Sequence, residues 1–359
     1  MKNKKVLVVL GGTSGEREVS LDSGRACIKA LKKKGYKVLT FDPKKKPLNL
    51  IDKNKTDVIF NALHGKDGED GVAQSYFEYL RIPYTHSGVI SSYNAMNKVI
   101  SKQIFKKYKI KSPAYFVLKK KDFNKIKSAL NRYGMLYFRN QKLSSKLYIK
   151  FAKKFGKLAN YPRLKGLSKK HPQITVVQRK FTDKGPSFGE QFHTDSIYTK
   201  KPPRFTMLLS ILVPKKGIAN TEFCSQYLAY KELPKSIKKK LKDVKARYSS
   251  EGPISVTTKE RVKEKGKSIK ELKSKHNIIK KISSNYSIYC SPGHFVGFSS
   301  KIKSQKKLKK FLFNHQIKKK FQFSLPWEKN QLAIWDNRSM LHQATPFKGN
   351  RIMHRITIK

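Results

Sequence analysis

Phe192-His193-Thr194-Asp195 places an imidazole and a carboxylate two residues apart. In an extended strand successive side chains point to opposite faces, so His193 and Asp195 would project on the same side. His-x-Asp is a weak signal by itself. His342, at the end of Trp335-Asp336-Asn337-Arg338-Ser339-Met340-Leu341-His342, offers a third donor. Two histidines and one carboxylate are the set that holds Fe(II) on one face and leaves the opposite face open to reactants.

Two arginines follow this third donor in Arg351-Ile352-Met353-His354-Arg355-Ile356-Thr357-Ile358. The alternation of a strand would put both guanidiniums on one face, where each presents a rigid fork that suits a carboxylate. Candidate metal ligands and anion clamps therefore lie close together in sequence. His354, between the arginines, should face the other way.

At these residues the chain resembles the taurine dioxygenase family of Fe(II)- and 2-oxoglutarate-dependent oxygenases. The resemblance runs from Tyr133-Gly134-Met135-Leu136-Tyr137-Phe138-Arg139-Asn140-Gln141 through the His-Thr-Asp triplet to the end of the chain. It implies that His193, Asp195 and His342 bind iron. It also implies that Thr221 and Arg351 hold the distal carboxylate of 2-oxoglutarate, and that Arg355 meets an anionic group on the substrate. Dioxygen would be the second cosubstrate.

The fold expected for this part is a double-stranded β-helix, or jelly roll, with flanking helices, because many short strand-like segments surround one helix-bearing insert. Phe205 to Val213 and Gln331 to Trp335 are examples of these strands. Residues 233–281 are rich in lysine, so we expect a helix from Leu233 to Val244 and then an exposed, mobile lid or insertion.

The N-terminal third has a different pattern, in which strand-like and helix-like segments alternate. Strands are expected at Lys5 to Leu10, Lys37 to Phe41 and Asp57 to Leu63, and Ser20 or Asp22 is expected to cap the first helix. This order predicts an α/β domain with a parallel, Rossmann-like sheet.

A second resemblance lies in Gly11-Gly12-Thr13-Ser14-Gly15-Glu16-Arg17-Glu18-Val19-Ser20 and in Asn61-Ala62-Leu63-His64-Gly65-Lys66-Asp67-Gly68-Glu69-Asp70-Gly71. Both are similar to the N-terminal, pre-ATP-grasp domain of D-alanine-D-alanine ligase. In that family the residues matching Glu16 and His64 help to place the first D-alanine, and the one matching Lys98 approaches ATP. His86 departs from the family pattern, which has glycine there, and Asn97 departs from its usual aspartate.

The ATP-grasp region of such a ligase is not recognisable after Leu118. Only 13 acidic residues follow Lys121, and no carboxylate pair followed by an amide stands in a strand that could bind magnesium. The predicted organisation is a ligase-like domain at residues 1–118, a junction at 119–124 and a taurine dioxygenase-like domain at 125–359. Without ATP chemistry, we expect Glu16 and His64 to be structural.

Charge is the unusual feature of the composition, with 81 Lys and Arg against 23 Asp and Glu and a formal net charge of +58. Lysine is spread along the whole chain, which favours a general lysine bias over a specific nucleic-acid surface. No segment approaches the roughly 18 apolar residues of a membrane span. The three cysteines, Cys27, Cys224 and Cys290, suggest neither a disulfide framework nor a zinc site. We therefore expect a cytoplasmic protein with no membrane partner. The sequence does not decide between a monomer and a homo-oligomer.

Three functions remain to be separated. The favoured one is a non-haem iron, 2-oxoglutarate-dependent dioxygenase that hydroxylates a small, anionic substrate and releases succinate and carbon dioxide. A catalytically inactive binding protein would use its positive charge to hold an acidic partner. A ligase-related protein would need ATP-grasp elements from another chain, and ATP binding would identify it.

Overall fold

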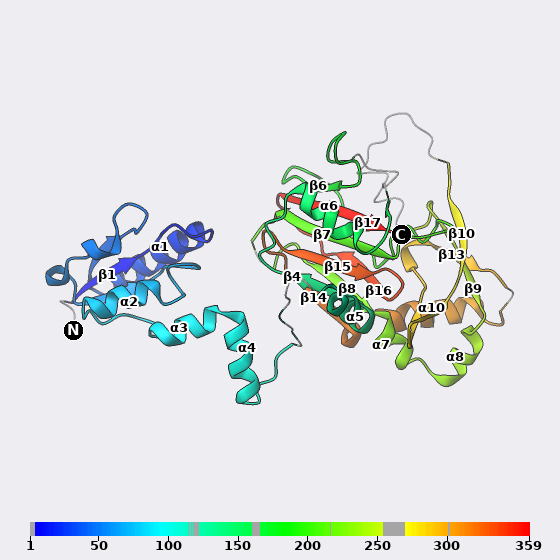
Figure 1. The fold of residues 1–359 in the computed structure, drawn as a ribbon, viewed down its shortest axis with the longest axis horizontal. Helices are drawn as coiled ribbons and strands as arrows, with labels where there is room; N and C mark the ends of the chain where they lie inside the picture. Colours follow the sequence, from blue (N-terminus) through cyan, green and yellow to red (C-terminus); the bar gives the residue numbers. More distant parts are fainter. Residues whose placement is uncertain are drawn as a thin grey trace. The chain divides into compact units, whose positions relative to one another are not determined.

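The computed structural model describes residues 4–113, 115, 117, 122–159, 166–215, 217–253, 270–300 and 302–359. The chain divides into two compact units, residues 1–119 and residues 120–359 (Figure 1). Each unit has its own sheet and its own apolar core.

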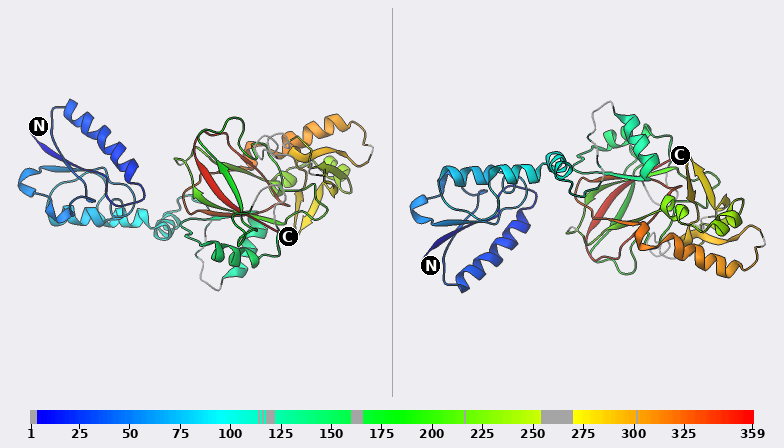
Figure 2. Two further views of the ribbon diagram at one scale, coloured as in Figure 1. Left: turned by 90° about the horizontal axis from the view of Figure 1, so that it is seen from above. Right: turned by 90° about the horizontal axis from the view of Figure 1, so that it is seen from below.

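The N-terminal unit is built on a parallel sheet, as the sequence predicted, and its strand order is β2-β1-β3. Side chains along the apolar strand β1 point alternately to the two faces of the sheet, and each face has its own core. Leu7 and Val9 pack with Phe77 of α2 on one face, and Val8 packs with residues of α1 on the other. Figure 2 shows these two helices on opposite sides of the sheet. The elements are β1 (Lys5–Val9), α1 (Arg17–Lys33), β2 (Lys37–Phe41), β3 (Val58–Asn61), α2 (Val72–Tyr79), α3 (Val89–Met96) and α4 (Lys98–Lys107), with short 3-10 turns at Leu48–Leu50 and Lys53–Lys55.

The prediction that Ser20 or Asp22 caps the first helix is wrong, because α1 already begins at Arg17. Ser20 lies inside the helix, where its hydroxyl donates to the Ala62 carbonyl at 2.6 Å and accepts from the Gly11 backbone N–H at 2.8 Å. The hydroxyl thus joins the turn after β1 to the residue that follows β3. A long-range contact of this kind leaves no local signal in the sequence.

The C-terminal unit contains a six-stranded antiparallel sheet in the order β4-β15-β7-β17-β5, with β6 also paired to β17, and a three-stranded sheet β14-β8-β16. Their bounds are β4 (Met135–Phe138), β5 (Leu158–Ala159), β6 (Thr175–Arg179), β7 (Phe205–Leu212), β8 (Thr221–Ser225), β14 (Gln322–Leu325), β15 (Leu332–Asp336), β16 (Met340–Ala344) and β17 (Arg351–Ile358). Helices α5 (Phe123–Tyr133) and α6 (Ser145–Lys153) flank the larger sheet (Figure 1).

These two sheets share one apolar core. Phe223 of β8 and Met340 of β16 pack with Trp335 of β15 and Met353 of β17, and all four side chains are buried. Because such cores are densely packed, they hold the ends of the strands in fixed register. The candidate site residues are attached to these strands.

The insert between β8 and β14 is more regular than the sequence predicted. Strand β9 (Lys245–Ser249) is the central strand of an antiparallel sheet β10-β9-β13, with β10 at Lys273–Asn277 and β13 at Phe295–Phe298. The remaining elements are α7 (Gln226–Lys231), α8 (Lys235–Leu241), β11 (Ile279–Ile282), β12 (Asn285–Ile288), α10 (Gln305–Gln316) and 3-10 turns at Pro292–His294 and Lys319–Phe321. Of the predicted lid, residues 254–269 lie outside the described residues.

Helix α8 is shorter than the predicted helix from Leu233 to Val244. It begins after Pro234, and the chain has passed into β9 by Lys245. Ala246 and Tyr248 of β9 are fully buried. These two side chains attach the lysine-rich region to the apolar core, which could not be expected from its average composition.

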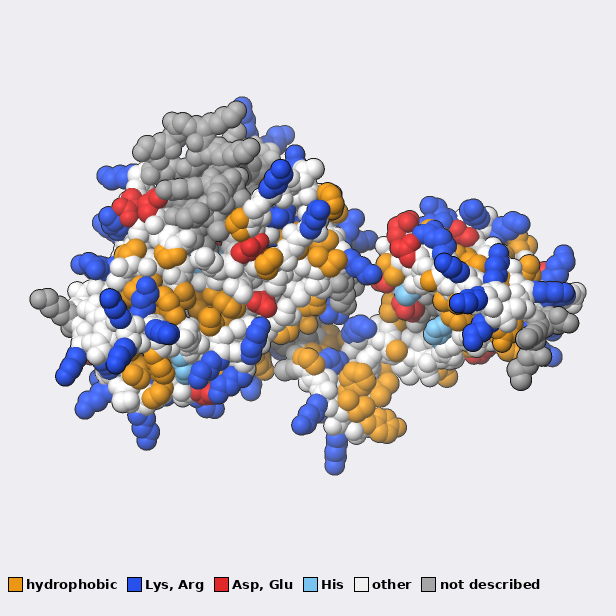
Figure 3. All heavy atoms as spheres, turned by 180° about the vertical axis from the view of Figure 1, so that it is seen from behind, with side chains coloured by type: hydrophobic (Ala, Val, Ile, Leu, Met, Phe, Trp, Pro, Cys, Tyr) orange, Lys and Arg blue, Asp and Glu red, His pale blue; other side chains and the backbone are white. Residues whose placement is uncertain are grey.

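Lysine and arginine side chains are scattered over the face of the molecule drawn in Figure 3, over both units. This distribution agrees with the spread of lysine along the sequence. Among the described residues no helix is both long enough and apolar enough to cross a membrane.

Candidate metal centre

His193 and His342 are brought together by the backbone. They form an isolated antiparallel bridge in which each backbone N–H donates to the other residue's carbonyl, both at 3.0 Å. His193 does not lie in a regular strand, contrary to the sequence prediction, and this single bridge attaches it to β16 instead. The two imidazole centroids are 4.3 Å apart.

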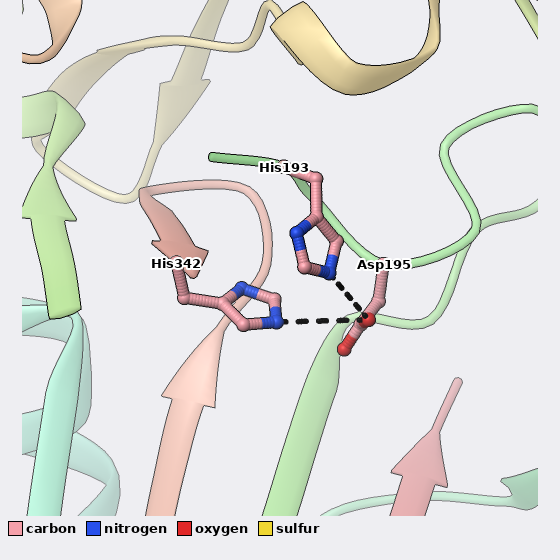
Figure 4. Close-up of side chains that lie close together, drawn as sticks. All are labelled: His193, Asp195 and His342. Carbon is pink, nitrogen blue, oxygen red and sulfur yellow. Dashed lines mark ion pairs between the residues drawn. The ribbon is translucent and has the colours of Figure 1, made fainter. Parts of the chain in front are cut away.

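Asp195 completes the cluster from two residues further along the chain (Figure 4). Its Oδ1 lies 3.8 Å from His193 Nε2 and 3.7 Å from His342 Nε2. All three side chains are buried. The three residues named from the sequence as metal ligands therefore converge, although Asp195 and His342 are 147 positions apart in the chain.

The protonation states of these groups suit a metal ion. Burial lowers the pKa of His342 to about 3, with the neighbouring His193 acting in the same direction. Burial likewise lowers the pKa of His193, against the attraction of Asp195. Burial alone would raise the pKa of Asp195, but Arg355 and the two histidines outweigh it and hold that pKa below its ordinary value. Two neutral imidazoles and one carboxylate result, which are the forms that bind metals.

The tautomer of His193 is set by its neighbour. Its Nδ1 lies 2.7 Å from the Gln191 carbonyl, which can only accept, so Nδ1 carries the proton and Nε2 presents its lone pair to the cluster. Gly189 leaves room for this ring, because a Cβ at that position would lie 3.0 Å from His193 Cε1.

The distances from Asp195 to the two histidines are compatible with a shared ion. Ligand atoms about 2.1 Å from one ion lie at most about 4.2 Å from one another. The two distances from Asp195 Oδ1, 3.8 Å and 3.7 Å, fall within that limit. The donor set is also the one typical of non-haem Fe(II) sites, so the residues fit the metal that the sequence implied.

Arg351 is a buried cation on β17. Its Nη1 donates to the Ala219 carbonyl at 3.4 Å, and its guanidinium lies 4.8 Å from the centre of the Phe347 ring. Burial lowers the pKa of Arg351 to about 10, and Arg179 adds to the effect. Within the described part of the chain, no carboxylate lies at ion-pair distance from Arg351. The charge of Glu190 raises the pKa of Arg351 but does not outweigh its burial. A buried guanidinium with so little compensation is costly for a fold, which points to an anionic ligand.

Thr221, the first residue of β8, is two residues from the carbonyl that Arg351 contacts. Its Oγ1 accepts a hydrogen bond from Trp327 Nε1 at 2.9 Å. An indole N–H can only donate, so this bond leaves the hydroxyl proton of Thr221 available for a further acceptor.

Arg355 is also buried on β17, with Nη2 2.7 Å from Asp195 Oδ1. The sequence prediction assigned it to the substrate and named a structural ion pair as the alternative. The structure shows an ion pair between Arg355 and Asp195, one of the candidate metal ligands. Arg355 is therefore part of this site, and its contact with a substrate stays a prediction.

Sequence reasoning missed two polar residues in this region. Thr206 donates to Asp195 Oδ2 at 2.6 Å, and Asn337 donates from Nδ2 to Thr206 Oγ1 at 2.8 Å. In the sequence they appear only as a threonine in the apolar run Phe205-Thr206-Met207-Leu208-Leu209 and an asparagine shortly before His342, and neither shows its partner there.

Comparison with protein families agrees with this arrangement. Residues 98–357 match the sequence model described as taurine catabolism dioxygenase TauD, TfdA family. The chain belongs to this family. Its members use Fe(II) and 2-oxoglutarate, which indicates a non-haem iron, 2-oxoglutarate-dependent dioxygenase type of enzyme for residues 98–357.

Solved structures of TauD-like dioxygenases share the fold. A taurine dioxygenase from Burkholderia xenovorans superimposes with a TM-score of 0.55 at 20% identity, covering 68% of this chain and 81% of that one. AAD-2 in complex with Mn(II) and N-oxalylglycine superimposes with a TM-score of 0.56 at 18% identity, covering 69% of this chain and 92% of that one.

The N-terminal part matches a different group of proteins. Residues 41–87 match the model of the D-ala D-ala ligase N-terminus. The D-alanine-D-alanine ligase of Pelagibacter ubique is 54% identical over 128 residues, which are 36% of this chain and 40% of the ligase. D-alanine-D-alanine ligase B of Mesorhizobium japonicum is 54% identical over 106 residues, which are 30% of this chain and 34% of that ligase. The chain thus spans less than half the length of these ligases.

The ligase-like site residues meet at the surface of the N-terminal unit. Glu16, His64 and Glu69 bring one potential ligand atom each within 4.8 Å of one another, but both glutamates are exposed and His64 is partly exposed. The Ser14 hydroxyl supports the loop by donating to the His64 carbonyl at 2.6 Å.

Proposed function

We propose that this protein is an Fe(II)- and 2-oxoglutarate-dependent dioxygenase that hydroxylates a small anionic molecule. The observation that carries the proposal is the buried cluster of His193, Asp195 and His342, with Arg351 buried near Thr221. Bound iron would couple the oxidative decarboxylation of 2-oxoglutarate by dioxygen, which yields succinate and carbon dioxide, to hydroxylation of the substrate.

In this proposal the chain has four tasks. His193, Asp195 and His342 hold the metal, with both imidazoles neutral because burial lowers their pKa values. Arg351 and the hydroxyl of Thr221 bind the distal carboxylate of 2-oxoglutarate, which would supply the buried guanidinium with an anion. Arg355 orients an anionic group of the substrate, since a guanidinium can bridge two anions. The apolar core around Trp335 excludes water.

The domain organisation proposed here keeps a ligase-like module at residues 1–118, a junction at 119–124 and a dioxygenase domain at 125–359. The division into compact units at residue 119 supports it. We infer that the six-stranded sheet and the β14-β8-β16 sheet form the jelly roll, because one apolar core joins them. The module is proposed to have no ligase activity, since no ATP-grasp region is recognisable after Leu118.

A screen of small carboxylates, sulfonates and phosphonates tests the function. The full-length protein with Fe(II), 2-oxoglutarate and oxygen should release succinate faster when the right anion is present, and Asp195→Ala should abolish the release. The same protein should show no thermal shift with ATP. Folded protein that binds Fe(II) but never releases succinate, with or without added anions, would favour the inactive binding protein instead.

A further inference from the structure

Thr206, Asn337 and Trp335 form a chain of hydrogen bonds that begins at Oδ2 of Asp195. The two histidines lie near the other carboxylate oxygen, Oδ1. Thr206 of β7 donates to Asp195 Oδ2 at 2.6 Å, and Asn337 Nδ2 donates to Thr206 Oγ1 at 2.8 Å. The Asn337 Oδ1 in turn accepts from Trp335 Nε1 at 3.0 Å. All of these side chains are almost fully buried.

The chemistry of the groups fixes the direction of every hydrogen bond. An indole N–H can only donate, so the oxygen of the Asn337 amide must face Trp335 and its nitrogen must face Thr206. Thr206 Oγ1 therefore accepts from Asn337, and its single proton is left for Asp195. A carboxylate can only accept, so the chain of hydrogen bonds ends there. The amide orientation, which usually has to be inferred, is here set by an unambiguous donor.

The two oxygens of Asp195 consequently have different surroundings. Oδ2 is occupied by the Thr206 hydroxyl. Oδ1 faces His193 Nε2 at 3.8 Å, His342 Nε2 at 3.7 Å and Arg355 Nη2 at 2.7 Å. The carboxylate is thus oriented so that one named oxygen enters the metal cluster.

We propose that Thr206 and Asn337 are positioning residues that reserve Oδ1 of Asp195 for the metal and keep Oδ2 out of its coordination. The inference rests on the proposed function, in which Asp195 is an iron ligand. Ligating carboxylates are commonly oriented by a hydrogen bond from a neighbouring residue, and the loss of such a partner weakens metal binding by about 10- to 100-fold.

The relay is attached to rigid parts of the fold. Thr206 and Trp335 are directly opposite each other in the β7–β15 register. The Asn337 backbone N–H donates to the Arg204 carbonyl at 2.8 Å, and its side chain also donates to the Pro203 carbonyl at 3.3 Å. The donor to Asp195 is therefore in place before a metal arrives, as preorganisation of a site requires.

Three variants of the full-length protein test the role of the Thr206 hydroxyl. Thr206→Val removes it at nearly constant volume, and Thr206→Ser retains it. Thr357→Val is the matched control, because Thr357 is the buried partner of Thr206 in the β7–β17 register and its hydroxyl donates to the Ala159 carbonyl at 3.3 Å. The measurements are the affinity for Mn(II) by titration calorimetry and the thermal unfolding of the metal-free protein.

The expected result is a loss of Mn(II) affinity by about 10- to 100-fold in Thr206→Val, with Thr206→Ser and Thr357→Val close to the wild type. A purely structural role would instead lower the unfolding temperature of both valine variants and leave both Mn(II) affinities unchanged, which would overturn the inference. Equal losses of affinity in the two valine variants would also overturn it.

Trp335→Phe tests the far end of the relay, and it replaces Thr206→Val should that variant not fold. Without the indole N–H the Asn337 amide keeps its donation to the Pro203 carbonyl but loses the donor that holds its oxygen, so a smaller loss of Mn(II) affinity is expected, and an unchanged affinity would contradict the relay. Wild-type protein that binds no Mn(II) would contradict the proposed metal centre itself, whereas wild-type binding with an unaffected Thr206→Val variant contradicts only the positioning role.

Discussion

Among the residues that the structure describes, two groups of side chains bring potential metal-binding atoms within 4.8 Å of one another, and they differ in burial. His193, Asp195 and His342 are all buried in the C-terminal unit, whereas Glu16 and Glu69 are exposed in the N-terminal unit and His64 is partly exposed. In the first group burial lowers the pKa values of both histidines, and Arg355 and the two histidines hold the pKa of Asp195 below its ordinary value. The comparison shows that desolvation, rather than residue type alone, separates a candidate active site from a surface cluster.

The largest expected difference between the two groups is in metal-dependent turnover. His342→Ala removes one of three buried ligands, so succinate release should fall by more than about 100-fold, beyond the loss caused by removing an outer partner of a ligand. His64→Ala in the N-terminal cluster should leave the release unchanged. Turnover that survives in His342→Ala, or is lost in His64→Ala, would reverse the roles assigned to the two units.

Arg351 should show opposite effects on binding and on stability. Arg351→Met is expected to weaken 2-oxoglutarate binding by more than about 30-fold, because a buried charge pair in the complex is lost. The same change should leave the free energy of unfolding of the ligand-free protein unchanged or raise it, by up to about 4 kcal/mol. Calorimetry with 2-oxoglutarate and urea unfolding measure the two effects. A destabilised apo protein with unchanged affinity would show that Arg351 is structural.

Thiol labelling distinguishes the units without any ligand. Burial raises the pKa values of Cys224 and Cys290 to about 12, so neither forms much thiolate at pH 8. Cys27 on α1 of the N-terminal unit is only partly buried. A thiol reagent should modify Cys27 alone in native protein, at a rate at least about 100-fold above that of the other two, as mass spectrometry can show. Rapid native labelling of Cys224 would mean that the core behind β8 opens readily.

Acid should affect the N-terminal unit through Asp42. A hydrogen bond from Arg17 lowers the pKa of Asp42 to about 2 from an ordinary value of 3.8. A lowered carboxyl pKa adds stability that is complete above the unfolded value and is lost as the pH falls from about 4 towards 2. Asp42→Asn should remove that part of the pH dependence.

The two tryptophans, Trp327 and Trp335, give a control for this acid effect because both lie in the C-terminal unit. Tryptophan fluorescence should report the same transition in Asp42→Asn as in the wild type, while the far-ultraviolet circular dichroism signal should differ between the two below about pH 4. Identical dichroism curves would show that the ion pair contributes nothing.

The smallest effect is expected at Glu16. Because its side chain is exposed, Glu16→Gln should change the free energy of unfolding by no more than about 0.5 kcal/mol and leave 2-oxoglutarate binding unchanged. Urea unfolding and calorimetry check both values. A clear loss of either would show that the ligase-like cluster has kept a function.

The side chains proposed as metal ligands could be named from the sequence, because His342 and the two arginines of β17 accompany a triplet that is a weak signal by itself. His193, Asp195, His342 and Arg355 come together in one buried cluster, and Arg351 is also buried, against the Ala219 carbonyl. The parallel sheet followed directly from the alternating apolar strands. What the sequence could not reveal were contacts made over long distances. The hydroxyls of Ser20 and Thr206 and the burial of β9 depend on neighbours that only the folded chain supplies.

The most direct test of the proposed metal centre is an anaerobic titration of full-length protein with Fe(II) and 2-oxoglutarate, followed by visible absorption. We predict a band that needs both additions, is absent in His193→Ala and requires far more 2-oxoglutarate in Arg351→Ala. The absence of any band in folded wild-type protein, or a band that persists in His193→Ala, would contradict the assignment of His193, Asp195 and His342 as the iron site.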